Sequence, residues 1–144
     1  MGIDLCLENQ TSVNLTMTWT KSADGVFEEL LVPGSKKCRA GVIKNYSEIA
    51  GVLQIPEGES LPVAEWEIKI VNNFIGAPFL RVARPGAWGC KEDFYEGTEN
   101  VIETGVERFV TKRNSDRNNK QFVVTAQPTQ GLRSDLTPCG VPRF

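Results

Sequence analysis

The sequence predicts an all-β protein, an antiparallel β-sandwich or alternatively a small barrel, of about eight to ten short strands. One observation is the unbroken alternation of apolar and polar residues over Val13–Thr20, which is the pattern of a strand with one buried face. A second is the series of short β-rich runs divided by Gly, Pro, Asn and Asp turn formers. A third is that no window of about a dozen residues shows a helical period.

The first twenty residues are expected to form a β-hairpin. Apolar residues alternate with other residues over Ile3–Leu7, as they do over Val13–Thr20, and the polar segment Asn9–Ser12 between the two runs is typical of a turn. Trp19 and, further along, Trp66 lie in phase with apolar neighbours on their strands, so we expect both indole rings in the core.

Further β-rich runs follow in chain order, and most are separated by turn formers such as Pro33-Gly34 and Pro85-Gly86. The segment Lys91–Glu96 is compatible with a single helical turn. The runs are Val26–Val32, Cys38–Ile43, Ile49–Ile55, Glu65–Val71, Phe79–Arg84, Val106–Lys112 and Gln121–Ala126.

A chain of 144 residues has room for one domain with its own core and little space for a second. We expect residues 1–126 to form a single β-sandwich domain. From Gln127 onward the chain is rich in Pro and Gly and poor in apolar residues. Residues 127–144 are therefore expected to form an extended, irregular C-terminal arm that packs on the domain or on a neighbouring subunit.

Composition excludes several classes of function. The chain contains no histidine, which removes the Ser-His-Asp and Cys-His mechanisms and a near-neutral imidazole switch. Sixteen Lys and Arg against eighteen Asp and Glu give a net charge of -2, which argues against general nucleic-acid binding. No apolar run approaches the roughly 20 residues that cross a bilayer, so no transmembrane segment is expected. No motif calls for a cofactor.

The chain has four widely scattered cysteines, which are Cys6, Cys38, Cys90 and Cys139. No two have the short spacing of zinc knuckles or thioredoxin-like motifs, so we expect no metal site. They are either reduced, buried residues or disulfide partners, and four cysteines allow three pairings. Two details favour disulfides: Cys6 lies on the strand face opposite Leu5 and Leu7, and Cys139 lies in a tail with little else to hold it. Disulfides would favour a secreted or virion surface setting.

The most distinctive polar run spans residues 112–120 and is expected to form a long hairpin tip. Its cations could bind a phosphate, a sulfate, a sialic acid or an acidic protein surface through charge-assisted hydrogen bonds. The simpler interpretation is a solvated loop whose polarity discourages pairing between sheet edges. The candidate binding residues in this run are Lys112, Arg113, Arg117 and Lys120.

Trp88 is the other candidate binding residue. It lies in the segment Arg84–Cys90, where flanking glycines permit the close approach of another molecule. A tryptophan in a loop can stack on a sugar ring or anchor an interface. The alternative is that the ring folds over the end of the sandwich.

Together these features predict a non-enzymatic module that recognises a surface or helps to build one, such as a secreted binding domain or a virion or appendage subunit. The expected partners are a protein or glycan surface, or identical subunits. One alternative is a small histidine-free hydrolase that uses carboxylates, Asp93 with Glu96 or Glu99. Another is a membrane-active sandwich toxin with an exposed aromatic cluster.

Overall fold

The computed structural model describes residues 2–41, 48–56, 63–71, 78–83, 92–94, 99–103, 107–115 and 119–128. This part of the chain contains eleven β-strands and no helix, so the prediction of an all-β protein is confirmed. The strands are β1 (Gly2–Asn9), β2 (Leu15–Lys21), β3 (Phe27–Leu31), β4 (Lys36–Ala40), β5 (Ile49–Pro56), β6 (Val63–Val71), β7 (Phe79–Ala83), β8 (Glu92–Phe94), β9 (Glu99–Glu103), β10 (Glu107–Ser115) and β11 (Asn119–Pro128).

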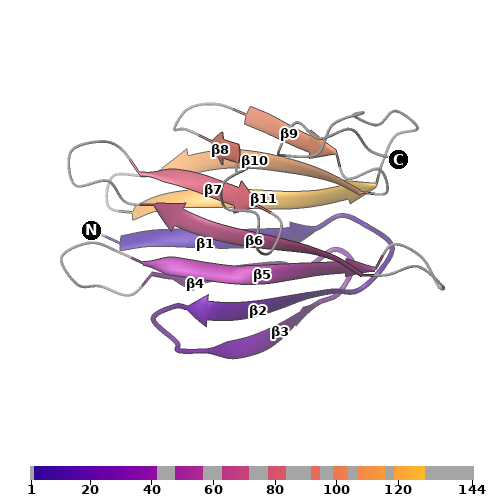
Figure 1. Cartoon of the computed structure of the whole chain (residues 1–144), viewed down its shortest axis with the longest axis horizontal. Coiled ribbons are helices and arrows are strands. Elements are labelled where there is room, and N and C mark those ends of the chain that lie inside the picture. Colours follow the sequence, from indigo (N-terminus) through magenta and orange to yellow (C-terminus); the bar gives the residue numbers. More distant parts are fainter. Residues whose placement is uncertain are drawn as a thin grey trace.

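The strands form two sheets that pack against each other as a sandwich (Figure 1). The five-stranded sheet has the order β4-β1-β11-β10-β9, and the six-stranded sheet has the order β3-β2-β5-β6-β7-β8. Within the described residues every strand pair is antiparallel except β1 with β11, which run parallel. The predicted antiparallel sandwich is therefore observed, with one parallel pair inside it.

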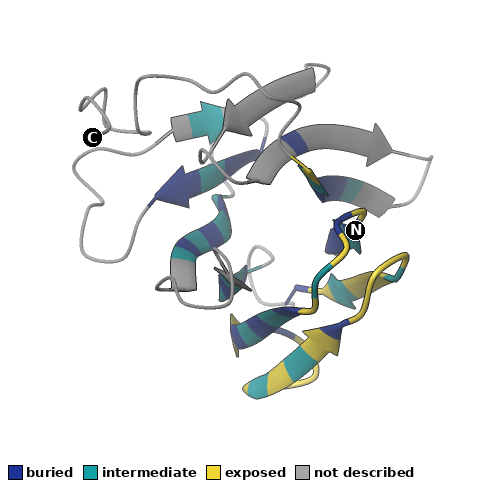
Figure 2. Cartoon of the chain, turned by 90° about the vertical axis from the view of Figure 1, so that its right-hand side faces the viewer, coloured by how far each residue is buried: buried dark blue, intermediate teal, exposed yellow. Residues whose placement is uncertain are grey.

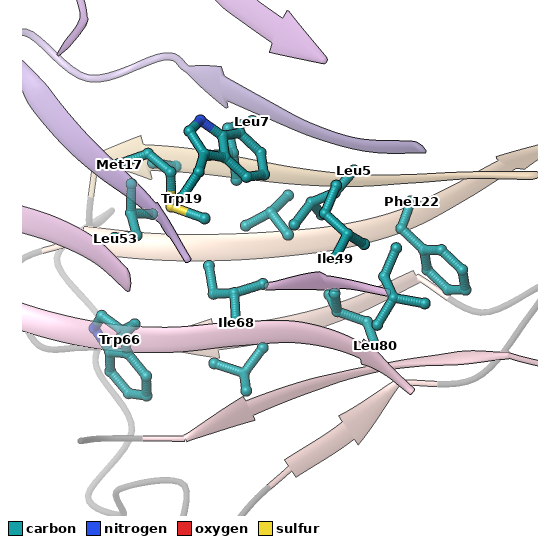
Figure 3. Packing of buried hydrophobic residues seen from close by; sticks show 14 of the residues in the cluster. Leu5, Leu7, Met17, Trp19, Ile49, Leu53, Trp66, Ile68, Leu80 and Phe122 are labelled. Atoms are coloured by element: carbon teal, nitrogen blue, oxygen red, sulfur yellow. The ribbon is translucent and has the colours of Figure 1, made fainter. Parts of the chain in front are cut away.

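The core lies between the two sheets and follows directly from the alternation in the sequence (Figure 3). In β2 the side chains of Leu15, Met17 and Trp19 are buried, while the threonines between them lie on the outer face. Leu5 of the five-stranded sheet and Trp66 of the six-stranded sheet join the same cluster. Both predicted core tryptophans are fully buried, at 0% exposure, which confirms that prediction.

The predicted hairpin over the first twenty residues is wrong. β1 pairs with β4 and β11, whereas β2 pairs with β3 and β5, so the two strands lie in different sheets. Alternation shows only that each strand buries one face. Leu5 and Met17 bury their side chains in the same core from opposite sides, and the chain turns a corner between the sheets instead of reversing within one.

Asn9 fixes this corner with its side chain, which is fully buried. Its amide Nδ2 donates to the carbonyl oxygens of Val13 and Leu31, both at 2.8 Å. Its Oδ1 accepts from the backbone N–H of Thr11 at 2.9 Å and from the Thr11 hydroxyl at 2.6 Å. The side chain thereby binds the corner to the end of β3.

The backbone of Asn9 binds the next connection in the chain. Its N–H donates to the carbonyl of Ser35 at 2.9 Å, and its own carbonyl accepts from the N–H of Gly34 at 2.7 Å. Gly34 has a φ of 83°, a left-handed conformation that favours glycine. One residue therefore aligns the β1–β2 corner with the β3–β4 connection.

A disulfide joins Cys6 of β1 to Cys38 of the edge strand β4. The two residues are direct partners in the strand register, with a Cα–Cα distance of 4.0 Å. The prediction of disulfides is thus confirmed for one pair. Cys90 and Cys139 lie outside the described residues.

The C-terminal half differs from the prediction in three places. Residues 92–94 form strand β8, in a segment that was compatible with a single helical turn, and β9 at Glu99–Glu103 was not predicted. β11 continues through Pro128, so Gln127 and Pro128 belong to the sheet and not to the predicted arm. The rest of that arm, residues 129–144, lies outside the described residues. The described part also contains no helix with the length and apolar character that a bilayer crossing requires.

Replacing the corner amide should destabilise the whole sandwich. In Asn9→Ala the buried carbonyls of Val13 and Leu31 and the N–H of Thr11 lose their partner, and each such loss costs about 1–3 kcal/mol. We expect urea unfolding to show a loss of about 3–5 kcal/mol. The control Asn14→Ala, at an exposed position nearby, should change stability by less than about 0.5 kcal/mol. A loss below about 1 kcal/mol for Asn9→Ala would contradict this role.

Removing the disulfide should also lower stability, because the bond closes a loop between residues 32 apart in sequence. Loop-closure entropy predicts that Cys6→Ala/Cys38→Ala loses about 3–4 kcal/mol of unfolding free energy. Reductant should destabilise the wild-type chain by a similar amount. Applying the same reductant to the double variant isolates any contribution of the other two cysteines, and equal effects on both proteins would refute the assignment.

Candidate functional site

The outer face of the six-stranded sheet carries a shallow hollow of about 250 Å³ over β2, β5 and β6. Small residues of β5 make room for it, because Ala50 and Val52 stand opposite the longer Lys69 and Glu67 of β6. The lining residues are Thr20, Ala50, Gly51, Val52, Glu67, Ile68 and Lys69.

A β-bulge at Thr20 shapes one wall of the hollow. The register passes from Trp19 opposite Gly51 to Lys21 opposite Ala50, so Thr20 is an extra residue in β2. β2 and β5 also approach closely here. A Cβ atom on Gly51 would lie 2.3 Å from Cε of Met17 and 2.7 Å from the carbonyl oxygen of Thr18, so only glycine fits at this position.

The polar groups of the hollow lie on one face, since Glu67 and Lys69 are alternate residues of β6. Next to them on the same strand, Glu65 accepts a hydrogen bond from Nε2 of Gln54 at 3.0 Å. A carboxylate, an ammonium group and the hydroxyl of Thr20 thus surround a small aliphatic floor. This arrangement can bind a polar group of a partner by hydrogen bonds.

A second group of residues joins the edges of the two sheets, where β3 and β4 are the edge strands. Arg39 donates to Glu29 through Nε, at 3.3 Å, and through Nη2, and its Nη1 donates to Asp24 at 3.2 Å. Its guanidinium lies 4.8 Å from the centre of the Phe27 ring. Trp19 Nε1 donates to Glu29 at 3.1 Å. We call these five residues the Arg39 cluster.

The Arg39 cluster keeps Glu29 ionised although its side chain is only 11% exposed. Burial alone raises the pKa of this carboxyl. Hydrogen bonds from Arg39 and Trp19, with the positive charges of Arg39 and Lys37, outweigh that effect and bring the pKa below 4.5. The hydrogen bond to Glu29 in turn raises the pKa of Arg39.

The outer side of β3 carries a row of exposed residues at every second position, which are Val26, Glu28, Leu30 and Val32. We call this row the β3 stripe. The exposed fractions of Val26, Leu30 and Val32 are 75%, 56% and 46%, and these three are the exposed large hydrophobic residues of the part of the chain that the structure describes. In the part of the chain that the structure describes, many of the exposed residues lie in and around β3 and β4 (Figure 2).

The five predicted binding residues are only partly covered by the structure. Lys112 and Arg113 lie in β10 and Lys120 lies in β11, so the sheet extends into the run that was expected to be a loop. Arg117 and Trp88 lie outside the described residues. The structure therefore does not show these five brought together, and their binding role stays a prediction.

Of the carboxylates named in the alternative hydrolase hypothesis, the two that the structure describes lie in different sheets. Asp93 of β8 binds Arg81 with both oxygens, Oδ1 accepting from Nε at 2.7 Å and Oδ2 from Nη2 at 3.1 Å. Its acceptors are thus engaged in a bidentate ion pair. Glu99 lies in β9 of the other sheet, and Glu96 is outside the described residues. Among the described side chains, no three His, Cys, Asp or Glu residues are placed to hold a metal ion.

Sequence reasoning missed the Arg39 cluster, although one signal for it was present. Glu29 is in phase with Phe27 and Leu31, so the alternation of β3 puts a carboxylate on the side that faces inward. A charge at such a position needs a partner of opposite charge. That partner, Arg39, comes from the other sheet and could not be chosen from the local pattern.

Comparisons with protein-family models, with curated proteins and with solved structures found no match to this chain.

The ion pair of Glu29 should make stability depend on pH in a defined direction. The folded state lowers the pKa of Glu29. The ion pair therefore stabilises the fold above about pH 4.5, and this stabilisation is lost as the pH falls through the pKa that Glu29 has in the folded protein. We expect Glu29→Gln to be less stable than wild type at pH 7 by about 1–3 kcal/mol, and the difference to shrink in acid. Chemical unfolding at several pH values measures this.

The exposed neighbour on the same strand provides the control. Glu28→Gln should change stability at pH 7 by less than about 0.5 kcal/mol. A deficit of Glu29→Gln that stays constant from neutral pH into acid would show that the ion pair is not its cause.

Proposed function

We propose that the chain is a non-enzymatic β-sandwich module that recognises a surface or forms part of one. The observation that carries this proposal is the β3 stripe, in which Val26, Leu30 and Val32 expose much of their apolar surface on one side of an edge strand. Covering grouped aliphatic side chains with a partner removes them from water and is favourable.

The rigidity of this side of the sandwich supports the proposal. The Cys6–Cys38 disulfide holds β4 to β1, and the Arg39 cluster holds β4 to β3. The Asn9 corner fixes the connection between β3 and β4. A surface that is already ordered loses little conformational entropy when it binds, which leaves more of the contact energy for affinity.

The outer face of the six-stranded sheet carries polar groups beside the β3 stripe. In the strand register, Leu30 stands next to Thr16 and Glu28 next to Thr18, and the hollow at Thr20 follows along β2. An apolar margin bordered by hydroxyls and charges matches the composition of protein interfaces, where a hydrophobic centre has a polar rim.

The disulfide supports an oxidising setting, and we propose a secreted protein or a component of a virion or extracellular surface. The proposed partners are a protein surface, a glycan surface or identical subunits. Trp88 and the cations of residues 112–120 are further candidate contacts in this proposal.

An array of glycans, extracellular proteins and immobilised copies of the chain itself tests the proposal. We expect the labelled chain to bind at least one class of spot. Leu30→Thr/Val32→Thr should weaken that signal by about tenfold or more, because two aliphatic side chains lose contact area while β-propensity is kept. Ser12→Ala, at an exposed position outside the stripe, should bind like wild type.

Two results would contradict the proposal. One is a wild-type chain that binds no glycan, no protein and no copy of itself. The other is a signal that is unchanged in the stripe variant and also in Trp88→Ala and Arg113→Ala.

A further inference from the structure

We propose that the edge formed by β3 and β4 binds a second copy of this chain about a two-fold axis, with β3 of each copy beside β4 of the other. This inference rests on the proposed function, because it names an identical subunit as the partner of the β3 stripe.

The two edge strands carry opposite charge. β3 has the sequence Phe-Glu-Glu-Leu-Leu, and β4 has the sequence Lys-Lys-Cys-Arg-Ala. Glu28 on β3 and both Lys36 and Lys37 on β4 are exposed. None of the three makes a salt bridge with another residue in the described part of the chain. The acidic, aliphatic edge strand β3 thus lies next to the basic edge strand β4, and both carry exposed charged groups that can form ion pairs with a partner.

The layers of the sandwich decide which strands can meet. β3 is the edge of the six-stranded sheet and β4 is the edge of the five-stranded sheet, and the contact of Arg39 with Glu29 shows that both edges lie on the same side. A two-fold axis that runs along the strands between the layers exchanges the layers. It therefore places β3 of one copy beside β4 of the other, once in each layer.

Charge complementarity selects this arrangement over the other two-fold arrangement. An axis perpendicular to the sheets would keep each layer in place and bring β3 beside β3 and β4 beside β4. Glu28 would then face an acidic strand, and Lys36 and Lys37 would face a basic one, which opposes association. Lysines on an edge strand discourage pairing with a like edge, but they favour an acidic one.

The outward side chains are complementary in the same way. Glu28 and Leu30 belong to the β3 stripe on the outer face, and Lys36 shares a face with Cys38, whose partner Cys6 lies opposite the core-facing Leu5. After the exchange of layers these two outer faces are continuous. Leu30 and Val32 then lie against the methylene stem of the partner's Lys36, and the acidic Glu28 lies on the same continuous outer face as that ammonium group.

Sedimentation velocity of the full chain over a wide concentration range tests the inference. We expect a reversible dimer at low salt whose dissociation constant rises with ionic strength. Lys36→Glu and, separately, Glu28→Lys should each raise the dissociation constant by about tenfold or more, because each puts like charges together. Combining the two changes should restore dimerisation, which also shows that the variants fold.

A matched control is Glu65→Lys, the same charge reversal on β6, at a residue that does not line the hollow and lies several strands away from the edge. It should leave the dissociation constant within about twofold of wild type. Unfolding curves of every variant accompany the sedimentation data.

The outcomes separate this inference from the proposed function. A wild-type chain that stays monomeric at every concentration overturns the inference, and so does a dimer that persists in both charge variants. If such a monomer still binds glycan or protein spots through the β3 stripe, the dimer is rejected and the proposed function stands. If it binds no spot at all, both are rejected.

Discussion

The contact between Arg39 and Glu29 is the interaction on which the open side of the sandwich depends. β3 turns a carboxylate inward, and such a group is tolerated there only with a cation beside it. Arg39 supplies the charge and, by reaching across from the other sheet, brings the two edges together. The fully buried Trp19 donates its Nε1–H hydrogen bond to the same carboxylate. Core packing and edge geometry are thus coupled through one side chain.

The sequence was informative wherever burial alone decides the structure. Alternation identified β2 and placed Trp19 and Trp66 in the core, because a period of two reports which face of a strand is buried. It could not say which sheet a strand joins, since both sheets bury side chains in one core, and the predicted hairpin failed for this reason. β8, at three residues, is too short to show any period. β10 runs on to Ser115 because the ladder bonds to β11 are made by the backbone and tolerate polar side chains.

The candidate site was harder to predict than the fold, because it is assembled from contacts between segments. Spacing left three disulfide pairings open, and only the register of β1 and β4 sets Cys6 opposite Cys38. Glu29 could be recognised as an inward charge, but its partner depends on the crossing from β3 to β4. The hollow depends on a bulge at Thr20 and on the small side chains of Ala50 and Val52 opposite longer ones, which no local pattern of hydrophobicity records.

The buried amide of Asn9 has a consequence for covalent modification. Asn9-Gln10-Thr11 has the Asn-x-Thr form of an N-glycosylation acceptor, yet the nitrogen that would carry the sugar donates to two carbonyls inside the corner. A glycan attached there in a nascent chain would keep that amide out of its place, so glycosylation of Asn9 and native folding exclude each other. Asn14-Leu15-Thr16 has the same form with an exposed asparagine, and a glycan at that position leaves the corner intact.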